Sequence, residues 1–204
     1  MGESRGTILV TGANGVLGSA VVREIVKSPS YCSSYYGLYT VRDSSSSSSL
    51  HASRTSLGWL ASGKIPPIRA LILNAGFQEN FTQTSTEDGF DMTFQVNYLS
   101  HFLLTLLLLG SMDKEKGRIL YIGSWVHDPD DTRNYVGPGA MLFPEKYRPI
   151  FRDGIDAVAR GTWSTPAEDP SALSGPILPW SHQQNAAKLL TPSIITLGMS
   201  YSVG

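Results

Sequence analysis

The sequence predicts an α/β fold built on a doubly wound parallel sheet. Four short apolar runs, each the length of a buried strand, alternate with segments of helical apolar spacing; the runs are residues 8–10, 37–41, 69–73 and 118–122. Strands that alternate with helices are joined by crossovers, so we expect parallel strands with right-handed connections. A glycine-rich turn directly after the first run indicates a ligand site at the carboxyl ends of the strands.

That turn lies within residues 7–18, TILVTGANGVLG, and leads into a helix predicted over residues 19–26. The first of its three glycines permits a tight turn, the second lets backbone approach a pyrophosphate, and the third lets helix pack against strand. The helix N-terminus adds N–H groups that favour phosphate. Glycines can also serve shape alone, but the flanking strand and helix favour a Rossmann-type dinucleotide site. The predicted contacts in this turn are Gly12, Asn14, Gly15, Leu17 and Gly18.

Composition favours one cytoplasmic domain spanning residues 1–204. The net charge of −1 and the absence of a basic stripe argue against a nucleic-acid partner. Cys32 is the only cysteine, so neither an internal disulfide nor a cysteine-based metal site is expected, and a reducing compartment fits best. The N-terminus has no apolar signal core. Residues 102–109 are strongly apolar but too short to span a bilayer, so we expect no membrane contact.

The segment after the second strand bears on two predictions, the choice of cofactor and the number of strands in the sheet. Arg42 stands where the adenosine ribose lies in dinucleotide folds, so it suits a 2′-phosphate, although an ordinary surface arginine is an equal alternative. Six serines at residues 44–49 predict a flexible linker, and residues 50–64 predict one amphipathic helix. This leaves no room for a third strand before residues 69–73, so the sheet is expected to lack an edge strand.

Two further strands deliver polar residues to the same edge of the sheet. The run at residues 69–73 leads into Asn74, Ala75 and Gly76, and the run at residues 118–122 leads to Ser124. Between them, residues 86–109 predict one long helix with an acidic first turn. Asn97 lies in the middle of that helix.

These four motifs, in this order over residues 6–127, resemble the short-chain dehydrogenase/reductases. The likeness is greatest to the 3-ketosteroid reductase-like and retinol dehydrogenase-like branches. It implies a nicotinamide cofactor, a small-molecule substrate and hydride transfer between the cofactor and a carbonyl or alcohol. A homodimer is a further expectation.

The resemblance also implies roles for the polar residues. Ser124 would hydrogen-bond the substrate oxygen, Asn97 would hold a water in the proton relay, and Asn74, Ala75 and Gly76 would line the cofactor site. A developing alkoxide needs such fixed donors and a proton source. A serine can also cap a strand-end turn, and a helical asparagine can simply satisfy backbone groups; for Asn97 both interpretations stay open.

The chain departs from the family pattern in several places. Its glycine spacing is TGxxGxxG rather than TGxxxGxG, and no tyrosine has a lysine four residues later. The best local match to the missing YxxxK pair places Gln184 in the tyrosine's position and Lys188 as the lysine that would hold the ribose. Glutamine cannot donate a proton near neutral pH. A solvated helix lysine is the alternative for Lys188. The stretch after it is expected to be too short for the usual C-terminal strands.

Residues 125–180 form a proline-rich insertion, in which a short helix is predicted around residues 155–159. A substrate lid carrying Phe143, Phe151 and Trp163 is favoured over a loose surface loop, because so many aromatic residues are poorly placed in solvent.

The sequence thus favours an NADP-dependent oxidoreductase, with NAD the less favoured cofactor and no metal. The expected substrate is a bulky apolar ketone or alcohol, steroid-like or a secondary metabolite. The alternatives are a pseudoenzyme that keeps its dinucleotide site, or an incomplete gene product.

Overall fold

The computed structural model describes residues 5–41, 58–60, 62–78, 83–124, 131–132, 135–137, 140–141 and 151–162. The chain divides into two compact units. The described residues of unit 1 come from Met1–Ala75 and Leu103–Ile122, and those of unit 2 come from Gly76–Phe102 and Gly123–Gly198.

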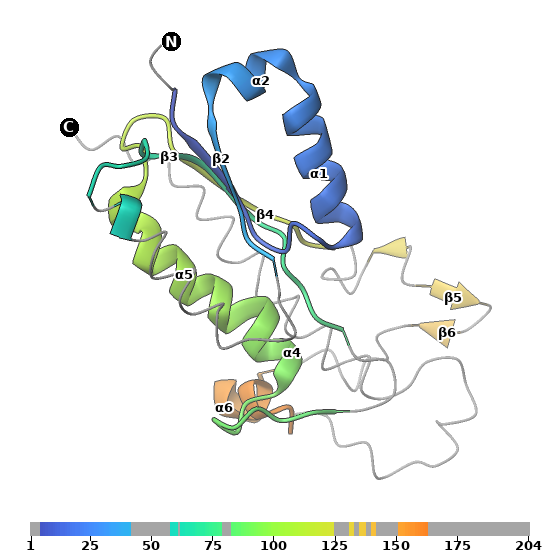
Figure 1. Ribbon diagram of the computed structural model, residues 1–204. Coiled ribbons are helices and arrows are strands. Elements are labelled where there is room, and N and C mark those ends of the chain that lie inside the picture. The colour runs from blue at the N-terminus through green and yellow to red at the C-terminus, as the bar shows by residue number, and fades with distance from the viewer. Residues whose placement is uncertain are drawn as a thin grey trace. The chain divides into compact units, whose positions relative to one another are not determined.

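Unit 1 contains a parallel sheet of four strands in the order β2-β1-β3-β4 (Figure 1). These strands are β1 Thr7–Val10, β2 Tyr36–Tyr39, β3 Ile68–Leu73 and β4 Arg118–Tyr121. In register, Val10 pairs with Tyr39 and Ile72, and Leu73 pairs with Tyr121, so the carboxyl ends of all four strands meet at one edge. All four predicted strands and their parallel direction are confirmed. Residues 42–57 lie outside the described part of the chain, so the missing edge strand stays a prediction.

Helices flank this sheet on both faces because successive strand residues point in opposite directions. Ile8 lines a cavity together with Ile25 and Val26 of α1 Val16–Lys27. Leu9 instead belongs to a buried cluster with Leu108 of α5 Ser100–Leu108. The other buried members of that cluster are Leu60, Ile65, Ile68, Leu71 and Leu73. A short helix, α2 Pro29–Ser34, follows α1 and leads into β2.

The predicted helix over residues 86–109 begins later than expected. Residues 86–89 form a turn, and the helical stretch starts with α4 Met92–Phe94, for which the buried Asp91 is the N-cap. The Asp91 carboxylate accepts from Phe94 N at 2.9 Å and fixes the start of the helix there. The acidic residues Glu87 and Asp88 therefore lie before the helix and not in its first turn. The stretch continues through a π-helical turn, Gln95–Leu99, into α5 and ends in a 3₁₀ turn, Leu109–Ser111.

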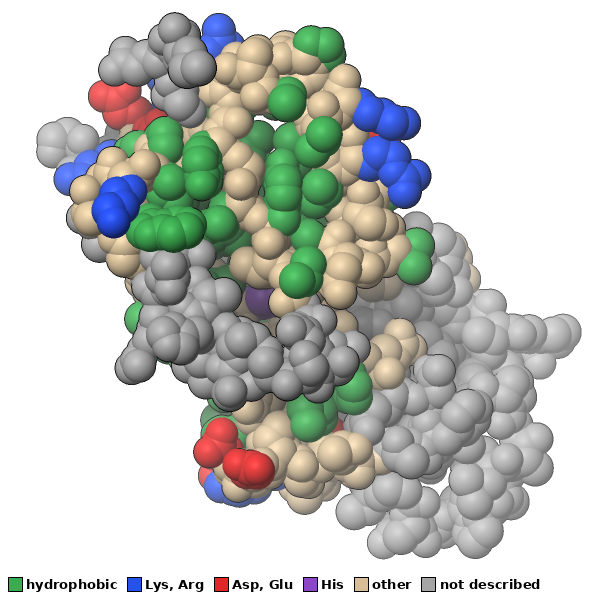
Figure 2. Space-filling model, in the orientation of Figure 1, with side chains coloured by type: hydrophobic (Ala, Val, Ile, Leu, Met, Phe, Trp, Pro, Cys, Tyr) green, Lys and Arg blue, Asp and Glu red, His purple; other side chains and the backbone are tan. Residues whose placement is uncertain are grey.

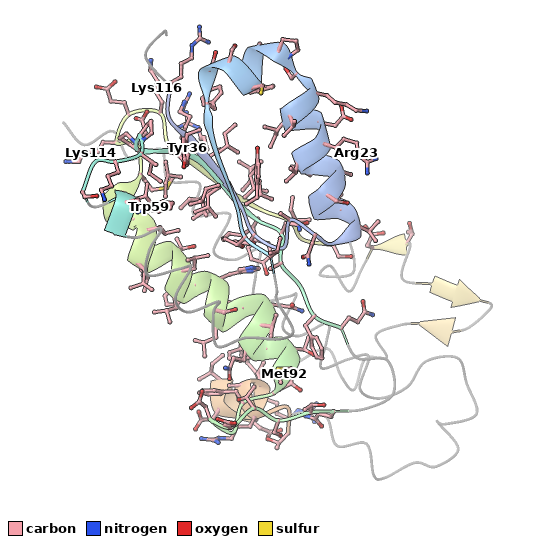
Figure 3. All side chains as sticks on the ribbon, viewed as in Figure 1. Arg23, Tyr36, Trp59, Met92, Lys114 and Lys116 are labelled. Carbon is pink, nitrogen blue, oxygen red and sulfur yellow. The ribbon has the colours of Figure 1, made fainter. Side chains whose placement is uncertain are left out.

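Unit 2 is organised around the start of this helix. α6 Gly154–Arg160 confirms the helix predicted around residues 155–159, and its Val158 and Ala159 form a buried cluster with Phe94. Met92 marks the start of α4 beside α6 (Figure 3). A two-stranded antiparallel pair, β5 Tyr135–Gly137 and β6 Ala140–Met141, was not predicted.

Two other predictions need comment. The helix expected over residues 50–64 does not reach its predicted end, because Gly63 adopts φ +69° and Lys64 lies beyond the turn; within the described part only residues 58–60 are helical.

The continuous stretch Met92–Ser111 is long and apolar enough to cross a membrane by length and composition, with 28% of it buried. Core helices of soluble proteins meet the same test, so the absence of membrane contact stays a prediction.

Candidate functional site

The glycine turn predicted after the first strand connects β1 to α1. Gly12 has φ +64°, a conformation that favours glycine, and a Cβ there would lie 2.8 Å from Ala75 Cα. A Cβ on Gly18 would collide with the carbonyl oxygen of Gly12 and lie 2.7 Å from Asn74 Nδ2. Both glycines are therefore required by close approach within the turn, Gly12 to Ala75 and Gly18 to the Gly12 carbonyl.

The tip of this turn is open to solvent. Gly15 is the N-cap of α1 and supplies no side-chain hydrogen bond to the first helical N–H groups. Asn14, Gly15 and Leu17 are exposed, and Val16 is 94% exposed. The start of a twelve-residue helix thus presents backbone N–H groups at an uncovered surface, which is the arrangement that binds phosphate.

Thr11 and Asn74 join the turn to the end of β3. The Thr11 hydroxyl oxygen accepts from Asn74 N at 2.9 Å and from Ala75 N at 3.0 Å. In return, Asn74 Nδ2 donates to the carbonyl oxygens of Thr11 and Gly12, at 3.0 and 3.2 Å. Asn74 therefore holds the shape of the turn. Sequence reasoning missed Thr11, whose only signal was a hydroxyl residue between a strand and the first glycine.

A third strand also supports the turn, since Ala13 N donates to Thr40 O, directly after β2, at 2.8 Å. The chain passes from β1 to β2 on one side and to β3 on the other, so the strand order reverses between β1 and β3. Open α/β sheets bind ligands at this switch point, outside the carboxyl ends of the strands. The turn and the Asn74–Ala75 segment both lie there.

Asn97 makes a two-point contact with backbone in unit 2. Its Oδ1 accepts from Phe77 N at 2.8 Å, and its Nδ2 donates to Phe77 O at 2.9 Å. The side chain is buried within the π-helical turn, a feature often found at functional sites. These contacts are those of the backbone-satisfying interpretation, and the water-holding role stays a prediction. Gly76 immediately precedes the residue that Asn97 holds.

Ser124 lies three residues beyond the end of β4 and is half-buried. It belongs to the same unit as Asn97, and their proximity stays a prediction. Arg42, Gln184 and Lys188 lie outside the described residues, as do Phe143, Trp163 and the serine run.

The described part of the insertion is fastened to the start of the long helix. Asp91 N donates to Ala159 O at 2.8 Å, and Gln83 Nε2 donates both to Gly161 O at 3.1 Å and to Asp91 Oδ2 at 3.3 Å. Gly161 ends α6 in the left-handed conformation, with φ +70°. Residues 154–161 are thus an anchored part of the insertion, whereas Phe151 beside them is half exposed.

A cavity of about 260 Å³ lies elsewhere in unit 1, between β2 and α1, and was not predicted. Its lining is rich in tyrosine and includes the side chains of Tyr31, Tyr35 and Cys32. Figure 2 shows hydrophobic side chains gathered there, and Arg23 points away from it (Figure 3). Among the residues the structure describes, no group of three or more His, Cys, Asp or Glu side chains could hold a metal ion.

Comparison with known proteins adds to this geometry. The short chain dehydrogenase family model matches residues 56–129. Short-chain dehydrogenase iccH of Talaromyces variabilis is 42% identical over 229 residues, covering 92% of this chain and 62% of that protein. Over these stretches the chain is similar to the short-chain dehydrogenase/reductases.

Other curated proteins match shorter stretches of the chain. Human retinol dehydrogenase 14 is 46% identical over 68 residues, 32% of this chain and 20% of that protein. Polyprenol dehydrogenase of Danio rerio is 42% identical over 66 residues, 30% of this chain and 20% of that protein. A solved short-chain dehydrogenase/reductase mutant of Serratia marcescens has 22% identity and a TM-score of 0.41, covering 60% of this chain and 57% of its own.

The chain spans 62% of the length of iccH. The aligned stretch of 229 residues is longer than the 204 residues of the whole chain, so iccH contains residues within it that this chain lacks.

Proposed function

We propose that the chain binds NADP(H) and acts as an oxidoreductase on a bulky apolar ketone or alcohol. The observation that carries the proposal is the glycine turn between β1 and α1, with its uncapped, exposed helix start at the switch point of the sheet. Similarity to the short chain dehydrogenase family model supports a nicotinamide dinucleotide as the cofactor.

The residues of the turn fit the pyrophosphate half of such a cofactor. A Cβ at Gly12 or Gly18 would meet Ala75 or the Gly12 carbonyl too closely, so these glycines let the turn pack tightly against the segment after β3. Leu17 would offer an N–H group, and Gly15 would lie beside the phosphate with its own N–H donating to Gly12 O at 3.1 Å, while Asn74 keeps the loop in shape. When bound, the nicotinamide ring supplies or accepts a hydride. Arg42 would favour NADP over NAD by pairing with a 2′-phosphate.

The catalytic groups would come from the neighbouring strand end and helix. The Ser124 hydroxyl would donate a hydrogen bond to the substrate oxygen, and Asn97 would hold a water for proton transfer. Lys188 would bind the ribose. Because position 184 is glutamine, the chain lacks the family's phenolic proton donor at that place, and we expect slow turnover.

Two observations support the substrate class: the aromatic residues of the insertion and the names of relatives. Retinol dehydrogenase 14 and polyprenol dehydrogenase are named for long apolar alcohols. We propose that residues 125–180 cover a substrate of that character, with α6 as an anchored part of the lid. A cytoplasmic location and a homodimer are proposed with it.

The test is NADPH oxidation with a reactive aromatic ketone, in the natural chain and in Ser124→Ala and Gln184→Tyr. We expect slow turnover that Ser124→Ala abolishes and that Gln184→Tyr raises about 10²-fold, the effect of a positioned acid. Saturable NADPH binding without turnover in any of these proteins would contradict the oxidoreductase and favour the binding-only alternative.

A further inference from the structure

His101 is a buried titratable residue that the proposed reaction does not use. It lies in α5 one helical turn after Asn97, and 4% of its surface is exposed. Burial lowers the pKa of its imidazole, and a backbone hydrogen bond at Asn97 opposes this to a smaller extent. A buried histidine in a leucine-rich helix is expected to make a specific hydrogen bond.

The ring has a specific contact with the Asn97 backbone. Nδ1 of His101 lies 3.2 Å from the Asn97 carbonyl oxygen. A carbonyl oxygen can only accept, so the neutral ring carries its proton on Nδ1 and donates it there. His101 thus hydrogen-bonds the backbone of Asn97, and the Asn97 side chain hydrogen-bonds Phe77.

The hydrogen bond from His101 matters because the helix is irregular around Asn97. In the π-helical turn Gln95–Leu99, Ser100 N donates to Gln95 O, five residues earlier, so the regular i−4 ladder is displaced around Asn97. A side-chain donor one turn later fixes the orientation of the Asn97 peptide. The Asn97 amide then transmits that orientation to Phe77 through bonds of 2.8 and 2.9 Å. Phe77 follows Gly76, a predicted cofactor contact.

We propose that His101 is a positioning residue, which holds the π-helical turn and through Asn97 fixes the backbone after Gly76 for the reaction. This role depends on the hydrogen-bond donor at Nδ1 rather than on the charge of the ring. The link to reaction rests on the proposed function; the link from His101 to Phe77 rests on the contacts alone.

A matched pair of variants separates the donor from the bulk of the ring. His101→Asn places an amide Nδ2 where Nδ1 stood, whereas His101→Leu fills the space without a donor. Hydrogen exchange of the Phe77 amide is measured in each full-length chain, with the Ala13 amide of unit 1 as control. We expect Phe77 to exchange about fivefold faster in His101→Leu, the effect of one lost hydrogen bond, and within twofold of the natural rate in His101→Asn.

Kinetics with NADPH and the test ketone provide the second readout. We expect kcat to fall about fivefold in His101→Leu with KM for NADPH unchanged, and His101→Asn to restore kcat. Equal losses in both variants, or an unchanged Phe77 rate in His101→Leu, would overturn the proposal. If the natural chain shows no turnover, the proposed function fails while the Phe77 rates still decide the role of His101. If His101→Leu does not fold, His101→Met takes its place in the same comparison.

Discussion

The glycine turn of unit 1 and the Asp91–Asn97 region of unit 2 are both fixed by hydrogen bonds to backbone, but in different ways. The shape of the turn depends mainly on its glycines and on backbone groups of adjacent strands. Hydrogen bonds between Thr11 and Asn74 connect the turn to the end of β3. The second region depends on side chains that reach distant segments, as Asn97 does to Phe77 and Gln83 does to Gly161. Local sequence spacing therefore predicts the glycine turn, but it does not predict the structure of the Asp91–Asn97 region.

The largest expected effect is overpacking of the turn by Gly18→Val. The new side chain would collide with the Gly12 carbonyl, so we expect a loss of about 3 kcal/mol in free energy of unfolding and of all NADPH binding. Urea unfolding and calorimetric titration measure these. Gly110→Ala is the control, since nothing lies within 4 Å of its added Cβ; its stability should change by less than about 0.5 kcal/mol. Similar behaviour of the two variants would show that the turn is not tightly packed.

Thr11→Val tests whether the turn also depends on one side chain. The methyl group leaves the amides of Asn74 and Ala75 without their acceptor, at a cost of about 2 kcal/mol in free energy of unfolding. Thr11→Ser keeps the hydroxyl and should lose less than half as much. A serine variant as unstable as the valine variant would contradict the hydrogen-bond account.

Asp91→Ala is the matching test in unit 2. It removes the N-cap of α4 and the acceptor for Gln83, so we expect about 1.5 kcal/mol of destabilisation and faster proteolysis near α6. The exposed Asp88, three residues earlier, gives the control Asp88→Ala, for which thermal unfolding should not change. Unchanged protease sensitivity of Asp91→Ala would mean that α6 is anchored by its apolar contacts alone.

The smallest effect concerns pH. Burial lowers the pKa of His101 in the folded chain below its unfolded value of 6.5, so the unfolded state binds more protons near that pH. This stabilisation is fully present above pH 6.5 and is lost as pH falls. Between pH 7 and 6 the free energy of unfolding of the natural chain should fall more than that of His101→Asn, measured by urea unfolding at each pH. The same pH slope in both proteins would place the titrating group elsewhere.

The sequence alone was sufficient for the strands of the sheet and for the glycine turn, because strand length, apolar runs and glycine spacing are local properties. It was not sufficient for the start of the long helix. Glu87 and Asp88 suggest an acidic first turn, yet Asp91 provides the cap, and that choice depends on Ala159 and Gln83 packing against it. The roles of Thr11 and Phe77 were hidden for the same reason, since their partners lie 63 and 20 residues away.

The central claim, that the start of α1 receives the phosphates of a dinucleotide, is tested most directly at Val16. This side chain is 94% exposed at the first position of the helix, so Val16→Asp and Val16→Asn differ in charge without disturbing the fold. NADPH is titrated calorimetrically into the natural chain and both variants. The account predicts weak saturable binding to the natural chain and to Val16→Asn, and at least about tenfold weaker binding to Val16→Asp, with a difference that shrinks as salt is added. Equal affinities for the two variants, or no saturable binding to the natural chain at millimolar NADPH or NADH, would contradict it.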